Sequence, residues 1–62
     1  MKSIWYNVYV MAEKKDYVFT ELNAARTFAN GKARATNERC ELTMVVREGH
    51  FASAHFVELF RP

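Results

Sequence analysis

The chain has 62 residues and a formal net charge of +2, so a single domain is expected. That charge is smaller than the net positive charge typical of a nucleic-acid-binding domain. It also excludes a DNA mimic, which would be strongly acidic. No run approaches the roughly 18 consecutive apolar residues of a membrane-spanning helix, so no membrane partner is expected.

A domain of this size buries only about 60% of the surface that its unfolded chain exposes. Such chains usually need disulfides, a metal, a partner subunit or dense packing. Cys40 is the only cysteine, which rules out an intramolecular disulfide. We therefore expect dense packing and a homodimer. The free cysteine, and a start that reads as a strand instead of a signal peptide, favour the cytoplasm.

Residues 4–19 predict a β-hairpin. The first strand, Ile4 to Met11, is rich in β-branched and aromatic residues and contains no Gly or Pro. Alternation places Val8 and Val10 on one face with Ile4 and Tyr6, and Trp5, Asn7, Tyr9 and Met11 on the other. A charged turn at residues 13–16 leads to a second strand at residues 17–19.

Residues 21–37 predict a helix, with Thr20 as its N-cap. Small and apolar residues recur at spacings of three and four, which indicates one buried face. These residues are Leu22, Ala25, Ala29, Ala33 and Thr36, flanked by Phe28. Because most are alanines, the helix should lie close to a sheet. Gly31 falls on the solvent side, as a weak point or as part of an Asn30-Gly31 turn.

Residues 40–46 and 50–60 predict a second hairpin, with a loop at Arg47-Glu48-Gly49. This register pairs Val46 with His50 and turns Ala52, Ala54 and Phe56 toward the helix. A shorter loop, Glu48-Gly49, would pair Val46 with Phe51 and turn Ser53, His55 and Val57 inward instead. The choice matters because a one-residue slip moves every side chain to the other face.

The predicted fold is α+β: a single helix packed on one face of a four-stranded antiparallel sheet, in the order β-β-α-β-β over residues 1–62. One helix cannot cover both faces of such a sheet. Under the first register, the uncovered face carries large apolar and aromatic side chains, which mark interaction surfaces. The expected partner-binding residues are Trp5, Tyr9, Val45, Arg47, Phe51, His55 and Val57.

We therefore expect a non-enzymatic protein-binding module that self-associates. A nucleic-acid-binding module that stacks bases on the aromatic face beside arginines is the alternative, and a regulatory subunit of a larger complex is another. A secondary polar surface is expected on the helix, where Arg26, Asn30 and Arg34 recur at every fourth residue. Such a stripe is more often the solvated side of the helix.

No catalytic residue, metal site or cofactor is expected. His50 and His55 would point to opposite faces of one strand, so they cannot share a metal ion. Ser53 and His55 share a face, but their Cβ atoms would stand about 6–7 Å apart, which is too far for a reliable hydrogen bond. The only glycines, Gly31 and Gly49, form no phosphate-binding loop.

The run from Phe19 to Ala29, followed by Leu42 to Gly49, resembles short phage and bacterial ββαββ domains. In these domains a strand ends in an aromatic residue, the helix opens with a leucine-x-x-alanine step, and a hairpin turns on a glycine. The resemblance spans residues 17–56 in element order. It implies an inhibitor that occupies the surface of a host polymerase or defence protein, acting in the host cytoplasm, and it assigns no functional residue.

Overall fold

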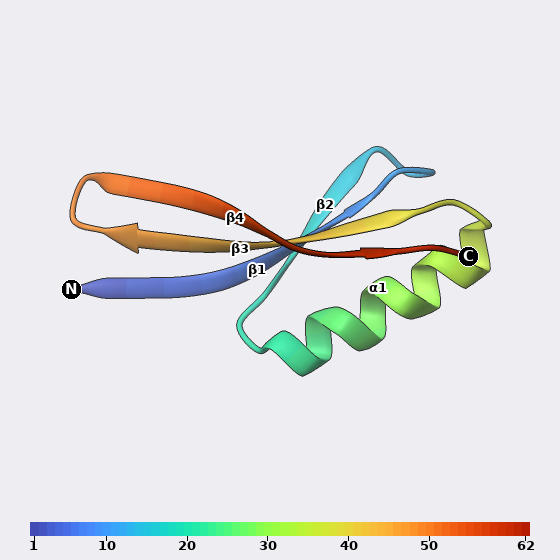
Figure 1. Ribbon diagram of the computed structural model, residues 1–62, viewed down its shortest axis with the longest axis horizontal. Helices are drawn as coiled ribbons and strands as arrows, with labels where there is room; N and C mark the ends of the chain where they lie inside the picture. Colours follow the sequence, from blue (N-terminus) through green and yellow to red (C-terminus); the bar gives the residue numbers. More distant parts are fainter.

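The computed structural model describes residues 1–62. Two strands, β1 (Lys2–Val10) and β2 (Lys15–Phe19), precede the helix α1 (Leu22–Thr36), and β3 (Cys40–Glu48) and β4 (Phe51–Phe60) follow it. The strands form one antiparallel sheet in the order β2-β1-β3-β4. The helix lies on one face of this sheet (Figure 1), which confirms the predicted fold class.

The core is small and lies where the helix crosses the sheet. Seven residues are buried, all of them apolar: Val8, Val10, Ala25, Ala29, Ala33, Cys40 and Leu42. The three alanines are the predicted stripe, and they let the helix backbone approach β1 and β3 closely. Aromatic side chains close one side of the core, because the ring of Phe28 contacts those of Tyr17 and Phe19 at centroid distances of 4.7 and 5.0 Å.

The helix ends differ slightly from the prediction. Glu21, not Thr20, occupies the N-cap position, with an extended backbone and no side-chain hydrogen bond to the first turn. The first helical bond runs from the Ala25 amide to the Glu21 carbonyl at 3.1 Å. At the other end Asn37 adopts a left-handed conformation, φ 57°, which stops the helix. The helix is continuous through Gly31, so no turn forms there.

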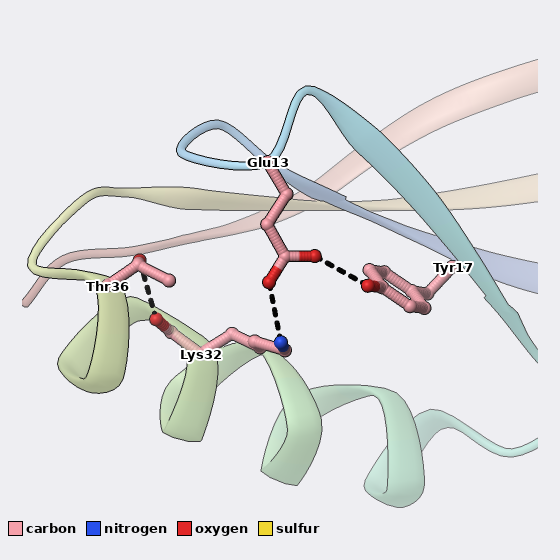
Figure 2. A network of polar contacts seen from close by, with 4 residues as sticks. All are labelled: Glu13, Tyr17, Lys32 and Thr36. Atoms are coloured by element: carbon pink, nitrogen blue, oxygen red, sulfur yellow. Dashed lines mark hydrogen bonds and ion pairs between the residues drawn. The ribbon is translucent and has the colours of Figure 1, made fainter.

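A polar cluster joins the first hairpin to the helix (Figure 2). Glu13, in the turn between β1 and β2, accepts a hydrogen bond of 2.5 Å from the Tyr17 hydroxyl through one carboxylate oxygen. Its other oxygen lies 2.6 Å from the Lys32 ammonium on α1. Thr36, one turn further along α1, donates a hydrogen bond to the Lys32 carbonyl. The two contacts of Glu13 therefore connect the turn to β2 and to the C-terminal half of the helix.

Both predicted registers of the second hairpin are wrong. The turn consists of Gly49 and His50, and it pairs Glu48 with Phe51 and Val46 with Ser53. Gly49 has a φ of 61° and His50 has a negative one, which is the pattern of a type II′ turn with glycine first. Glycine suits this position as well as the left-handed position of a three-residue loop, so its presence did not fix the loop length.

This register reverses the faces of β4 that the first prediction gave. Because the pairing is displaced from that prediction by an odd number of residues, Ala52, Ala54 and Phe56 lie on the face away from the helix. The predicted register with the shorter loop placed Ser53 and His55 on the correct face. It paired Val46 with Phe51, however, whereas the structure pairs Val46 with Ser53. A β-bulge opposite Leu42 and Thr43 then restores Glu58 and Phe60 to the helix side.

Candidate protein-interaction surface

The helix covers only part of the sheet. The molecule extends 38 Å along its longest axis, and the start of β1 and the β3–β4 turn lie at the end away from the helix (Figure 1). We call this part the sheet extension, and it comprises residues 2–5 of β1, 44–48 of β3 and 51–57 of β4. None of its residues is buried, although β3 pairs here with β1 on one side and with residues 51–56 of β4 on the other.

Large apolar side chains are exposed in the sheet extension. Phe51 is 83% exposed and Phe56 66%, and Ile4 and Val57 are about half exposed or slightly less. Strand alternation places Phe51 and Ile4 on the helix side of the sheet and Phe56 on the other. Both faces of the sheet extension therefore present apolar surface.

We call the sheet face away from the helix the open face. Four of the predicted partner-binding residues share it: Trp5, Tyr9, Val45 and Arg47, of which Trp5 and Val45 are direct cross-strand partners. Phe51 and His55 were expected here and instead lie on the helix side, because the hairpin register differs. Phe56, which the sequence pattern assigned to the core, takes their place. Val57 lies in the bulge without a partner on β3.

The backbone of β4 is unpaired on its outer side. The turn closes on Glu48 and Phe51, so Phe51, Ser53 and His55 direct their amides and carbonyls inward to β3. The residues between them, Ala52, Ala54 and Phe56, must direct theirs outward. Between Phe51 and Val57 the strand has no Lys, Arg, Asp, Glu or Pro, which are the residues that usually protect an edge from pairing.

An open hollow of about 400 Å³ lies on the helix side of the sheet extension. Its lining combines two charged side chains, Lys2 and Glu48, with Phe51, and is completed by Val46, Ala52 and Ser53. All but Val46 are exposed. A small-molecule site usually encloses most of its ligand, and this hollow is open to solvent.

The predicted polar residues of the helix, Arg26, Asn30 and Arg34, differ in the contacts that they form. The Arg26 guanidinium lies 3.1 Å from a carboxylate oxygen of Glu58 on β4, so it connects the helix to the sheet. Asn30 and Arg34 are exposed. Arg26 is exposed as well, so all three side chains reach the surface, and only Arg26 forms an ion pair.

One side-chain contact differs from the expectation. The Ser53 hydroxyl lies 3.1 Å from His55 Nε2, because the two side chains lean toward each other along the strand. Both are exposed, and no carboxylate hydrogen-bonds to His55. His50 lies in the turn, and no group of three or more His, Cys, Asp and Glu residues is arranged to hold a metal ion.

Cys40 is a buried free thiol on β3. Burial is the main cause that raises the pKa of this thiol, and the nearby Glu13 carboxylate adds to it. The thiolate is therefore disfavoured, which suits a structural residue.

Comparisons with protein-family models, with curated proteins and with solved structures gave no match. The helix is too short and too polar to cross a membrane.

Proposed function

We propose that the chain is a protein-binding module that contacts its partner through the open face and the sheet extension. One observation carries the proposal: the sheet extension contains no buried residue but exposes Phe51, Phe56, Ile4 and Val57. Exposed apolar side chains that gather in one region mark interaction surfaces in folded proteins. The open face adds an aromatic anchor, Trp5, beside Arg47, and both residue types are enriched at binding hot spots.

The ββαββ resemblance suggests the class of partner: a host protein whose surface a phage or mobile-element product occupies. A regulatory subunit that docks in a larger assembly would use the same surface. Both uses are non-enzymatic, and both require a heterologous protein on the open face.

Site-specific photo-crosslinking tests the proposal. A photoreactive phenylalanine analogue replaces Trp5 on the open face in one variant and the exposed Asn30 on α1 in a matched control. Each variant is irradiated in an extract of the native source. We expect a saturable adduct with a heterologous protein from position 5 only. The adduct should disappear when unlabelled protein is added in excess or when Val45→Glu is introduced beside the crosslinker.

Equal labelling from positions 5 and 30, or no adduct that excess unlabelled protein removes, would overturn the proposal. Circular dichroism of the Val45→Glu variant shows whether it still folds. If it does not, Arg47→Glu at the exposed end of the open face serves in its place.

Nucleic acid is the second candidate, because the open face combines Trp5 and Tyr9 with Arg47 on one surface. Aromatic side chains on a sheet can stack on bases while arginines contact phosphates. A titration against single- and double-stranded oligonucleotides at decreasing salt tests this candidate. Phosphate contacts strengthen as salt falls, so absence of binding at low salt removes it.

A further inference from the structure

The outer edge of β4 has the features of a strand that pairs with another strand. Its residues from Phe51 to Val57 carry no formal charge and no proline, and Ala52, Ala54 and Phe56 direct their backbone groups outward. The other edges are different. β2 is short and carries Lys15 and Asp16, and only residues 2–5 of β1 extend beyond it, beginning at Lys2. Long, uncharged edges are the ones that pair between molecules.

We propose that a second copy of this chain occupies that edge, with the two β4 strands antiparallel and a two-fold axis beside Ala54. The outer edge of β4 is part of the sheet extension, and its partner there is the chain itself instead of a heterologous protein. The two sheets then join into one eight-stranded sheet. The second copy thereby pairs an edge that a single chain leaves unpaired.

This register satisfies the backbone and the side chains together. Each of the outward-directed residues meets another one: Ala54 meets the partner's Ala54, and Ala52 meets the partner's Phe56. A hydrogen-bonded antiparallel pair requires that match. On the open face, the small Ala52 also leaves room for the ring of the partner's Phe56. Phe56 is 66% exposed in the single chain. No pair sets like charges against each other.

The bulge limits the length of the new pairing. A β-bulge bends its strand and increases the local twist, and here it lies at Val57. The helix packs mainly on β1 and β3, so it leaves the outer side of β4 clear. Rotation about an axis perpendicular to the sheet keeps equivalent faces together. The two open faces therefore form one continuous surface, with both helices on the other side.

The size of the exposed surface agrees with a missing partner. A folded monomer of this mass exposes about 4,100 Å² by the usual scaling, whereas this chain exposes 4484 Å². Its radius of gyration is 11.9 Å, and a compact chain of this length has about 10.6 Å. The sheet extension, in which no residue is buried, adds to this exposed surface, and the second copy would cover part of it along β4.

Disulfide trapping tests the register. In Ala54→Cys the two new thiols face each other across the axis at a Cα separation of about 5.5 Å, which suits a disulfide. In the matched control Ala52→Cys the equivalent thiols lie roughly 14 Å apart. Native Cys40 is buried. We expect mild oxidation to convert Ala54→Cys to a covalent dimer at least tenfold faster than Ala52→Cys. Equal rates, or faster trapping at position 52, would overturn the register.

A charge swap tests the pairing without oxidation. Ala54→Lys and Ala54→Glu should each be monomeric by light scattering, because like charges would face each other at the axis. An equimolar mixture of the two should recover the dimer mass. Ala24→Lys, on the exposed side of α1, should remain dimeric as the control.

A wild-type protein that stays monomeric up to millimolar concentration would overturn this inference. It would leave the proposed function standing, because crosslinking from position 5 to a heterologous protein is measured separately. Conversely, a dimer with no heterologous adduct would overturn the proposed function alone. A dimer that both charged variants retain would place the interface elsewhere and overturn the β4 pairing.

Discussion

The two glycines of this chain occupy opposite kinds of position. Gly31 lies on the exposed side of α1, where a methyl group added to its Cα would meet no atom within 4 Å, and its φ is ordinary for a helix. Gly49 begins the β3–β4 turn with a φ of 61°, in the left-handed region. The first glycine therefore tolerates a side chain, and the second is required by the turn.

Substitution of these glycines by alanine should change stability in opposite directions. Gly31→Ala should stabilise the fold by about 0.5–1 kcal/mol, because alanine loses less backbone entropy in a helix. Gly49→Ala should destabilise it by about 1–2 kcal/mol, the usual penalty for a left-handed non-glycine residue. Urea unfolding of both variants provides the measurement. A destabilised Gly31→Ala variant would contradict a continuous, solvent-facing helix at this position.

Asn7 is the one residue with a buried side-chain polar atom that lacks a partner. It lies on the open face in β1, between Val18 of β2 and Thr43 of β3, and its Oδ1 accepts no hydrogen bond. An unpaired polar atom costs about 1–3 kcal/mol when it is removed from water. We expect Asn7→Val to stabilise the fold by about 1 kcal/mol, measured by thermal unfolding. Asn7→Asp should destabilise it, because it places an unpaired charge there.

At the scale of elements, an ion pair between Glu13 and Lys32 connects the turn of the first hairpin to the helix. The hydrogen bond from Lys32, followed by the one from Tyr17, lowers the pKa of Glu13 below its ordinary 4.5. The same contacts raise the pKa of Lys32 above 10.5 and the pKa of Tyr17 above 10.0. Each shift favours the state in which the contacts form: an ionised Glu13, a protonated Lys32 and a neutral Tyr17.

These shifts predict how stability depends on pH. The contribution of Glu13 is present above its ordinary pKa of 4.5 and is lost as the pH falls through its lower folded value. The contributions of Tyr17 and Lys32 are present below 10.0 and 10.5 and are lost as the pH rises through their higher folded values. Unfolding midpoints of wild type and Glu13→Gln should therefore differ most between about pH 5 and 10 and converge outside that range. Glu38→Gln, which removes an exposed carboxylate outside the ion pairs, is the control. A constant difference at every pH would contradict an ionic origin.

The elements also differ in how well the sequence predicted them. The alanine stripe of α1 and the alternation of β1 each pointed to one buried face, and both are confirmed. The β3–β4 hairpin carries apolar residues on both faces, including Phe51 and Phe56, so no pattern selected the core side. The bulge at Val57 changes the alternation again within the same strand. Trp5, Tyr9, Val45 and Arg47 lie on the expected face because β1 and β3 pair in the register that their alternation favours.

At the scale of the whole molecule, the position of the core explains the shape. The buried residues all lie where α1 crosses the sheet, and the strands continue beyond the helix with no cover. The sequence predicted an uncovered face but not an uncovered end, because hydrophobic patterns report faces and carry little information about how far along a strand the helix reaches. The unpaired edge of β4 could therefore be identified only from the three-dimensional structure.

The same shape predicts that stability depends on protein concentration. If β4 pairs with a second copy, folding is coupled to association, and each tenfold increase in concentration above the dissociation constant should stabilise each protomer by about 0.7 kcal/mol. For a domain of this size that is roughly 3–6 °C in melting temperature. Scanning calorimetry over a concentration range of about 5 to 500 μM provides the measurement. Ala54→Lys should melt at one temperature throughout, because its strands repel at the axis. A wild-type melting temperature that is equally constant would mean that the small core beneath α1 sustains the fold alone, with the sheet extension left free for a different protein.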